Sequence, residues 1–333
     1  MDAVHIVGAG GIGCTVGYAL ASAGVPVVFV ESNPRKVEVA RRRRDPVRVE
    51  DRFGKPLGTA AAEFVHWPDW RPQPGTRVFL CTKCYHNAQV LERLDPSIRV
   101  LPIQNGFDPR LDSHGHEFEG IASFVAECLP GESVVRLTRK GALHLGRRDS
   151  GPTADSELQQ LAAALRSAHL FRVQLVPRIE PIKYAKLMYN AAISPLAAAA
   201  GIDNGRLLSV PAARRLFFGL LQENYRILSS NGITLGKVGP FHPRTVAWIL
   251  RQRWLARLMA RGFEPSLRGT YCSMAGEIEK GRTEIENYNG HLIRLAEKSG
   301  APCPLNRAVH SLVVRMTEAR ESPRMDVLRE LAQ

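Results

Sequence analysis

Short apolar runs alternate with helical patterns in the first half of the chain. The first run occupies residues 4–7, a helical pattern extends through Ala23 and stops at Gly24, and a second apolar run fills residues 27–30. Three more strand-like runs follow at residues 77–81, 99–103 and 121–125. Strands separated by helices are typical of an α/β domain whose sheet is mainly parallel.

The pattern changes in the second half of the chain. From about Pro177 the strand signals fade and long helical patterns take over, with punctuation at Pro177, Pro181, Pro195, Gly232, Pro240 and Pro265. A chain of 333 residues also exceeds the size that one hydrophobic core usually supports. We therefore predict two domains, an α/β domain over residues 1–178 and an all-α domain over residues 179–333.

A glycine-rich turn joins the first predicted strand to the first predicted helix, with the sequence Gly8-Ala9-Gly10-Gly11-Ile12-Gly13. In this context Gly8 permits a tight turn, Gly10 lets the backbone approach a pyrophosphate, and Gly13 lets the helix pack closely on the strand. The phosphates would meet backbone N–H groups and the positive end of the helix dipole. The motif predicts a Rossmann dinucleotide-binding domain rather than a merely glycine-rich turn.

An acidic residue, Glu31, follows the second apolar run, 18 residues after Gly13. A carboxylate at this point usually accepts hydrogen bonds from the adenosine ribose hydroxyls, and it repels a 2′-phosphate. Glu31 therefore favours NAD over NADP. Two alternatives stay open, because Arg35 and the run Arg41–Arg44 are close enough in sequence to neutralise a phosphate, and because a glutamate at a strand end can simply be solvated.

Polar residues follow two of the later predicted strands. Thr82 and Lys83 come after the run at 77–81, and Gln104, Asn105 and Gly106 come after the run at 99–103. Ligands of doubly wound sheets bind at the carboxyl edge of the strands, so these residues are candidates for a site. The turn-forming habit of Asn-Gly is the alternative explanation for Asn105.

Polar residues at helical spacing mark the second half. Lys186, Asn190 and Ser194 are four residues apart and so share one helical face, although a solvated stripe has the same spacing. Ser273 and Glu284 are 11 residues apart and share a face if that stretch is one helix. Gly276 and Gly281 between them argue against a continuous helix.

The net charge alone does not choose among nucleic acid, a membrane surface and an anionic small molecule as the partner. The formal net charge is +13, and we interpret the densest basic run, Arg41–Arg44, as a solvated helix end, since no nucleic-acid motif accompanies it. Six scattered cysteines indicate reduced thiols, and Cys81-x-x-Cys84 lacks the second pair that would complete a zinc site, so we expect no metal.

No apolar run approaches the roughly 18 residues that span a bilayer, and a signal-type leader is missing. We expect a cytoplasmic protein with no membrane partner.

Several of these segments together resemble the ketopantoate reductase family, whose members reduce a 2-oxo acid to its 2-hydroxy acid with a nicotinamide coenzyme. The resemblance covers nearly the whole chain. Its anchors are Gly8–Gly13, Thr82-Lys83, Gln104-Asn105-Gly106, Lys186-Leu187 with Asn190 and Ser194-Pro195-Leu196, and Ser273-Met274 with Thr283 to Glu286 and Asn289-Gly290. It implies a Rossmann domain followed by a helical domain similar to the C-terminal domain of 6-phosphogluconate dehydrogenase.

The resemblance also implies roles for single residues. Lys186 is similar to the family's catalytic lysine, which hydrogen-bonds the ketone and donates a proton as hydride arrives, and Glu284 to its acidic partner. Asn190 and Ser273 match positions that hold the substrate, while Asn105 and Lys83 match residues at the coenzyme and substrate cleft. The lysine's role is chemically reasonable, because a positioned ammonium stabilises the negative charge that develops on the ketone oxygen.

Three positions depart from the family. Ser194 stands where an asparagine is common in the family. Thr270 or a neighbour stands where the family has an asparagine a few residues before the position of Ser273. Both positions touch substrate in the family. Many relatives carry a basic or neutral residue in place of Glu31 and use NADPH, so the resemblance favours NADP where Glu31 favours NAD.

Three functions follow from these observations. Reduction of 2-dehydropantoate (ketopantoate) to pantoate, in pantothenate biosynthesis, is the leading prediction. A related dehydrogenase for another hydroxy or oxo acid, and an NAD-sensing protein without turnover, are the alternatives. A homodimer formed through the helical half stays open.

Overall fold

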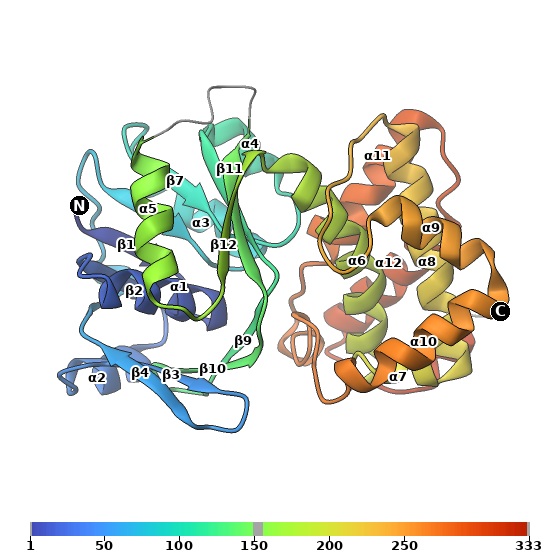
Figure 1. Cartoon of the computed structure of the whole chain (residues 1–333), viewed down its shortest axis with the longest axis horizontal. Helices are drawn as coiled ribbons and strands as arrows, with labels where there is room; N and C mark the ends of the chain where they lie inside the picture. Colours follow the sequence, from blue (N-terminus) through green and yellow to red (C-terminus); the bar gives the residue numbers. More distant parts are fainter. Residues whose placement is uncertain (1, 149–155, 332–333) are drawn as a thin grey trace. The chain divides into compact units, whose positions relative to one another are not determined.

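The computed structural model describes residues 2–148 and 156–331, and the chain divides into two compact units (Figure 1). The first unit comprises Met1–Glu180 and the second Pro181–Gln333. The first contains the sheets and the second is helical. The predicted class, a Rossmann-like α/β domain followed by an all-α domain, is confirmed.

A five-stranded parallel sheet organises the first unit, in the order β5-β2-β1-β6-β7. Its strands are β1 (Val4–Val7), β2 (Val27–Glu31), β5 (Glu63–His66), β6 (Arg77–Leu80) and β7 (Arg99–Pro102). The predicted runs match β1, β2, β6 and β7, with ends that differ by at most one residue. Both faces are covered, because Ile6 and Phe79 pack into one hydrophobic cluster while Val7 and Leu80 pack into another.

The first unit also contains helices and single helical turns. They are α1 (Gly11–Ser22), α2 (Pro34–Arg41), η1 (Trp67–Asp69), η2 (Cys84–His86), α3 (Asn87–Leu91), α4 (Pro109–His114) and α5 (Ser156–Ser167). Helix α1 packs against α5 on one side of the parallel sheet (Figure 1). The run Arg41–Arg44 lies at the end of α2 as predicted, and all four residues are exposed.

Two smaller sheets complete the first unit. One has the order β4-β3-β10-β9 and the other β12-β11-β8. Their strands are β3 (Val47–Asp51), β4 (Pro56–Ala60), β8 (Phe118–Ala122), β9 (Val125–Cys128), β10 (Val134–Arg139), β11 (Ala142–Arg147) and β12 (Arg172–Arg178). The single strand predicted at 121–125 is wrong, because the chain leaves one sheet after Ala122 and enters another at Val125. Ser123 marks the crossing, where its N–H donates to the carbonyl of Ala142 at 2.7 Å.

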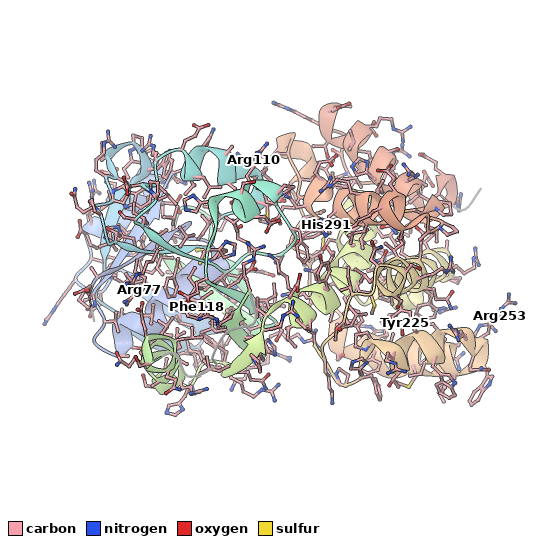
Figure 2. All side chains as sticks on the ribbon, turned by 90° about the horizontal axis from the view of Figure 1, so that it is seen from above. Arg77, Arg110, Phe118, Tyr225, Arg253 and His291 are labelled. Atoms are coloured by element: carbon pink, nitrogen blue, oxygen red, sulfur yellow. The ribbon has the colours of Figure 1, made fainter. Side chains whose placement is uncertain are left out.

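The second unit is a helical bundle. Its elements are α6 (Glu180–Ala200), which begins at the boundary, α7 (Arg206–Ser209), α8 (Pro211–Ser230), α9 (Pro243–Arg251), α10 (Arg253–Leu267), η3 (Ile278–Lys280), η4 (Glu286–Gly290), α11 (His291–Ser299), α12 (Pro304–Glu318) and α13 (Val327–Glu330). Arg253 on α10 is exposed and extends away from the helices (Figure 2). None of the helices in the described ranges is long and apolar enough to cross a membrane.

Pro195 and Pro265, which punctuate the helical patterns in the sequence, both lie inside helices. A proline cannot donate to the carbonyl four residues earlier. For Pro195 that carbonyl belongs to Ala191, and the side chain of Asn289 donates to it at 2.9 Å instead. Pro195 thus leaves the Ala191 carbonyl available to accept from Asn289, and this hydrogen bond links α6 to η4.

A buried polar network extends this link through the bundle. Asn289 also donates to Asn306 at 2.9 Å, and Asn306 donates to Glu223 and to Asn224 at 2.8 Å each. Asn224 in turn donates to the carbonyl of Met188 on α6 at 2.9 Å. Because buried polar groups are costly when they lack partners, the network fixes how α6, α8, η4 and α12 pack.

Candidate functional site

The glycine-rich turn follows β1 at the carboxyl edge of the parallel sheet. Gly8 has a φ of +98°, and a Cβ there would lie 2.8 Å from the backbone nitrogen of Thr82. A Cβ on Gly11 or Gly13 would lie 2.0 Å from the carbonyl oxygen of Ala126 or Gly8 respectively. At Gly10, by contrast, a Cβ would meet nothing within 4 Å. Three of the glycines are therefore required by packing, whereas Gly10 leaves open space.

Helix α1 presents its N-terminus at this turn. It begins at Gly11, with Gly10 as the capping residue, and no side chain caps it. The first N–H groups of a helix have no partner inside the helix, and they carry the positive end of the dipole. An uncapped helix start beside an open glycine is suited to binding the pyrophosphate of a dinucleotide.

Glu31 ends β2, as predicted, but it is not simply solvated. Its Oε1 accepts the N–H of Asn33 at 2.9 Å, and its Oε2 lies 3.3 Å from Nζ of Lys36. The Glu31 side chain is 14% exposed, and that of Lys36 is 7% exposed. The carboxylate is thus held at the strand end by the backbone N–H of Asn33 and the buried ammonium of Lys36.

Lys36 is also part of a cluster beneath the glycine turn that the sequence did not indicate. Its Nζ donates to the carbonyl of Ala9 and, at 3.2 Å, to Sγ of Cys128. Sγ of Cys14 donates to the same carbonyl at 3.1 Å and lies 3.9 Å from Sγ of Cys128. Burial alone would lower the pKa of Lys36, but the two thiols and Glu31 raise it above its usual value.

The polar residues after β6 and β7 meet at the same edge. The side-chain nitrogen of Gln104 donates to the Thr82 carbonyl at 2.8 Å and to the Thr82 hydroxyl at 3.1 Å. Lys83 follows Thr82 directly and precedes η2. Within the described residues, Oδ1 of Asn105 is buried without a hydrogen-bond partner. An orphaned acceptor at the edge where dinucleotides bind indicates that a ligand donor belongs there.

Cys84 of the Cys-x-x-Cys sequence is buried near this edge. Its Sγ donates to the backbone carbonyl of Asn105 at 3.0 Å. Burial raises the pKa of the Cys81 thiol to about 12. Over the described ranges, no group of three or more His, Cys, Asp or Glu residues is arranged to hold a metal ion.

In the second unit, α6 carries Lys186, Asn190 and Ser194 on one continuous helix of 21 residues. Burial lowers the pKa of Lys186 to about 8, because a low-dielectric environment disfavours the ammonium. A lysine with such a pKa exchanges a proton readily near neutral pH, which general acid catalysis requires.

Ser273 and Glu284 are brought together by a residue that the sequence reasoning missed. Oγ of Ser273 lies 3.2 Å from the hydroxyl of Tyr288, and that hydroxyl donates to Oε2 of Glu284 at 3.4 Å. Tyr288 is fully buried and Glu284 is 2% exposed. The stretch is not one helix, since Gly276 and Gly281 take left-handed φ angles of +69° and +72°.

Tyr288 belongs to η4, a single π-helical turn, and such turns occur frequently at functional sites. The spacing of Glu284 and Tyr288 was visible in the sequence as an i, i+4 pair. A buried tyrosine at that spacing is ordinarily a core residue, so the pattern alone did not single it out.

The loop before Ser273 reaches α6. Sγ of Cys272 donates to the backbone carbonyl of Ser194 at 3.4 Å. Together with the Asn289 bond to Ala191, this contact brings the segments around Ser194, Ser273 and Glu284 to one part of the bundle. The hydroxyl of Thr270 has other partners, since it donates to the carbonyl of Leu267 at 2.6 Å and accepts from Asn204 at 3.2 Å.

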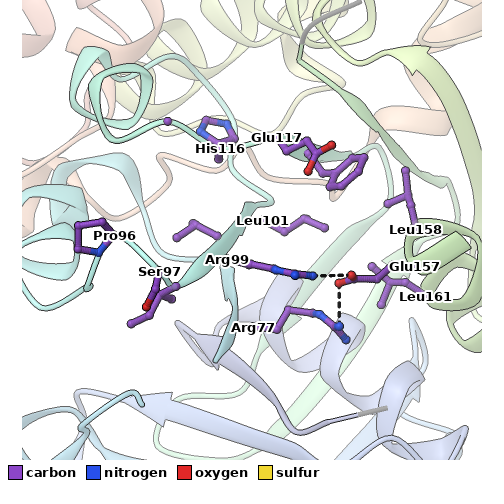
Figure 3. A pocket seen from close by; sticks show the side chains of 14 residues that line it. Arg77, Pro96, Ser97, Arg99, Leu101, His116, Glu117, Glu157, Leu158 and Leu161 are labelled. Atoms are coloured by element: carbon purple, nitrogen blue, oxygen red, sulfur yellow. Dashed lines mark hydrogen bonds and ion pairs between the residues drawn. The ribbon is translucent and has the colours of Figure 1, made fainter. Parts of the chain in front are cut away.

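A pocket of about 460 Å³ lies at the opposite edge of the parallel sheet, where β6 and β7 begin (Figure 3). Arg77 and Arg99, the first residues of these strands, each pair with Glu157 on α5 at 2.7 Å (Figure 3). None of the predicted site residues lines the pocket. Since ligands of such sheets bind at the carboxyl edge, we assign this pocket no part in the coenzyme site.

Comparison with known proteins links both units to one family. The model described as ketopantoate reductase PanE/ApbA matches residues 4–158, and the model for the C-terminal part of the same family matches residues 178–317. A 2-dehydropantoate 2-reductase from Archaeoglobus fulgidus is 25% identical over 324 residues, which cover 93% of this chain and 96% of that relative.

Solved structures share the fold. The ketopantoate reductase of the PanE/ApbA family from Ralstonia eutropha JMP134 has a TM-score of 0.74 at 23% identity, with 96% of this chain and 99% of that one covered. A D-mandelate dehydrogenase in complex with NADH and anilino(oxo)acetate has a TM-score of 0.76 at 19% identity, with the same coverage of the two chains, 96% and 99%. At these identities the likeness establishes the two-unit fold.

Proposed function

Because the chain belongs to the ketopantoate reductase family and is therefore a nicotinamide-dependent oxidoreductase, we propose that it reduces the ketone of a 2-oxo acid, with ketopantoate as the first candidate substrate. The observation that carries the proposal is the side-chain arrangement of the second unit. A partly desolvated lysine on α6 and a linked serine, tyrosine and glutamate are the groups that such a reduction needs.

The first unit fits a nicotinamide dinucleotide. The open space at Gly10, the uncapped start of α1 and the orphaned Oδ1 of Asn105 all suit such a ligand at the carboxyl edge. We assign Gly8–Gly13 to the pyrophosphate, Glu31 to the adenosine ribose, and Lys83 and Asn105 to the nicotinamide end. When bound, the coenzyme supplies the hydride.

Lys186 is the proton donor in this proposal. Its ammonium hydrogen-bonds the ketone oxygen, stabilises the negative charge that develops there, and transfers a proton to it. The lowered pKa, about 8, supports this role because the ammonium still predominates at neutral pH while its proton is easier to release. Glu284, which is buried and accepts from the Tyr288 hydroxyl, is assigned the role of acidic partner in the site.

Ser273 and Asn190 hold the substrate's polar groups. Because the Tyr288 hydroxyl donates to Glu284, the Ser273 hydroxyl donates to Tyr288, and its oxygen is oriented to accept from a hydroxyl of the substrate. Asn190 lies one helical turn from Lys186, on the same face. Ser194 and Thr270 complete the predicted substrate set. The hydroxyl of Thr270 is engaged with Leu267 and Asn204, so we expect its role to be support of the loop.

We propose NAD(H) as the preferred coenzyme. The Glu31 carboxylate is fixed in place by Asn33 and Lys36, and its remaining lone pairs can accept from two ribose hydroxyls. Arg35, the nearest cation in sequence after the turn, is exposed and lies outside this cluster. NADPH oxidation at an efficiency equal to that of NADH would contradict this assignment.

The experiment follows the absorbance of the reduced coenzyme with ketopantoate, supplying NADH and NADPH separately. It compares the wild type with Lys186→Ala and with Lys298→Ala, which changes an exposed lysine on α11. We expect oxidation that Lys186→Ala reduces by at least about 10²-fold and Lys298→Ala leaves unchanged. Equal activity in wild type and Lys186→Ala would refute the role of Lys186.

A second candidate is a dehydrogenase for another 2-hydroxy or 2-oxo acid. Ser194, where an asparagine is common in the family, and the structural likeness to a D-mandelate dehydrogenase with bound NADH favour it. A panel of 2-oxo acids with aliphatic and aromatic side chains distinguishes the two candidates. Coenzyme binding without turnover of any of them would leave a sensing role instead.

A further inference from the structure

Two cysteines from distant parts of the sequence meet beneath the glycine turn. Cys14 lies in the first turn of α1, and Cys128 ends β9. Their Sγ atoms are 3.9 Å apart, and they lie 3.1 Å (Cys14) and 3.5 Å (Cys128) from the carbonyl oxygen of Ala9. Neither residue has a part in the proposed reduction of the substrate.

The two thiols have different chemical characters. The hydrogen bond with Cys14 and the neighbouring ammonium of Lys36 lower the pKa of Cys128, which favours its thiolate form. The bond to Cys128 and complete burial raise the pKa of Cys14 well above its usual value. Cys128 is partly exposed, whereas Cys14 is fully buried. A reactive thiolate thus stands next to a protected thiol, the arrangement of an attacking and a resolving cysteine.

We propose that Cys128 and Cys14 form a peroxide-sensitive pair that closes to a disulfide under the glycine turn and weakens coenzyme binding. The inference concerns the coenzyme unit and does not depend on which oxo acid is the substrate.

The chemistry needs only hydrogen peroxide as oxidant. The Cys128 thiolate attacks one peroxide oxygen, so an S–O bond forms, the O–O bond breaks, and the leaving hydroxide takes up a proton to give water. The Cys14 sulfur then attacks the Cys128 sulfur, an S–S bond replaces the S–O bond, and the hydroxyl leaves with the Cys14 proton as a second water.

Closure requires a local movement. A disulfide bond is about 2.0 Å long, so the two sulfur atoms must approach each other by about 1.9 Å. The neighbouring packing leaves little freedom, since Gly11 already lies against the carbonyl of Ala126, two residues before Cys128. Drawing β9 towards α1 therefore displaces the backbone of the glycine turn.

The disulfide also removes hydrogen-bond donors from that turn. In the reduced form the Ala9 carbonyl accepts from Cys14 and Lys36, and Cys128 lies within reach. Oxidation eliminates the Cys14 S–H group and the Cys128 thiolate that accepts from Lys36. We expect the coenzyme dissociation constant to rise by about tenfold or more, which corresponds to losing one or two hydrogen bonds that hold the turn. By reciprocity, bound coenzyme should make the disulfide easier to reduce by the same factor.

The test uses the full chain, reduced and then freed of reductant. Samples are exposed to increasing hydrogen peroxide, digested and analysed by mass spectrometry, while NADH binding is measured in parallel by fluorescence. We expect a peptide pair linked through Cys14 and Cys128 at lower peroxide than any oxidation of Cys81 or Cys303. The weakened NADH binding should be reversed by dithiothreitol.

Variants separate this pair from other thiols. For each variant the readout is the ratio of NADH dissociation constants after and before peroxide. Cys128→Ser should remove both the linked peptide and the change in affinity, and Cys14→Ser should leave Cys128 to proceed to the sulfinic acid. The matched control Cys81→Ser should keep the wild-type ratio.

Either of two results would overturn the proposal. One is Cys128 remaining reduced at peroxide levels that oxidise the other thiols. The other is a linked peptide that forms without any change in NADH affinity. Both readouts are independent of catalysis, so a failure to turn over ketopantoate leaves the test intact.

Discussion

Gly10 offers a way to separate the folding role of the glycine turn from its binding role. Its φ of −81° and ψ of −166° are open to alanine, and the added Cβ would meet nothing within 4 Å. Alanine allows the unfolded chain fewer conformations than glycine does, which stabilises the folded variant by about 0.4–1 kcal/mol. Alanine is also a poorer helix cap than glycine, and this destabilises the folded variant by about the same amount. We therefore expect Gly10→Ala to leave the stability of the free protein nearly unchanged.

Coenzyme affinity should respond differently. The same Cβ occupies the space through which a pyrophosphate approaches the helix start. The loss of close contact with the N–H groups of α1 should weaken NADH binding by about tenfold or more.

Gly13→Ala is the matched comparison. Its Cβ would lie 2.0 Å from the Gly8 carbonyl oxygen and 3.1 Å from Cγ2 of Ile6, so β1 and α1 must separate. Overpacking of this kind costs about 1–3 kcal/mol, and each kcal/mol lowers Tm by about 2–4 °C for a unit of this size.

Thermal unfolding without coenzyme, followed by equilibrium titration with NADH, measures both effects. A Gly10→Ala variant that binds NADH as tightly as the wild type would refute the assignment of this turn to the pyrophosphate. A Gly10→Ala variant that unfolds as early as Gly13→Ala would refute the separation of roles.

Three further predictions concern the helical unit. With the pKa of Lys186 near 8 and its ammonium as the donor, kcat/KM for ketone reduction should be level below about pH 8 and fall about tenfold per pH unit above it; a rate that rises with pH would contradict the role. Tyr288→Phe removes the hydroxyl that orients Ser273, so KM for the oxo acid should rise while NADH affinity stays unchanged, as steady-state kinetics and equilibrium titration would measure. Asn289→Ala should destabilise the protein by about 2–4 kcal/mol in urea unfolding, because it leaves the Ala191 carbonyl without its donor and breaks the bond to Asn306.

The central fold was predictable because its signals are local. The glycine turn and the apolar runs around it each specify a conformation within a few residues, so β1, α1 and β2 were placed almost to the residue. The strands β3, β4, β5 and β10–β12 were missed because most of them mix charged or polar residues with apolar ones. Their sheet also depends on a distant pairing, since β3 pairs with β10 far along the chain. Ile121 to Val125 reads as one apolar run, yet the change of sheet at Ser123 depends on β11, which lies beyond it.

The site was predictable in part for a related reason. Lys186, Asn190 and Ser194 follow helical periodicity, so their common helix could be expected. Tyr288 could not be distinguished from a core aromatic, because its role arises from its contact with Ser273, 15 residues earlier. The link between α6 and η4 through Asn289 spans 98 residues and leaves no trace in periodicity.

Lys36 shows why charge patterns at a strand end are insufficient for assigning coenzyme preference. In the sequence it is one of several basic residues on a short helix, and a solvated position is the natural interpretation. In the structure it is buried between Glu31 and Cys128, so part of the negative field of Glu31 is already offset. A 2′-phosphate would meet a fixed ion pair with its carboxylate oriented by Asn33, rather than an isolated charge. We therefore expect any discrimination between NAD and NADP to depend on hydrogen-bond geometry at Glu31 more than on net charge, with Lys36 contributing by fixing where that carboxylate points.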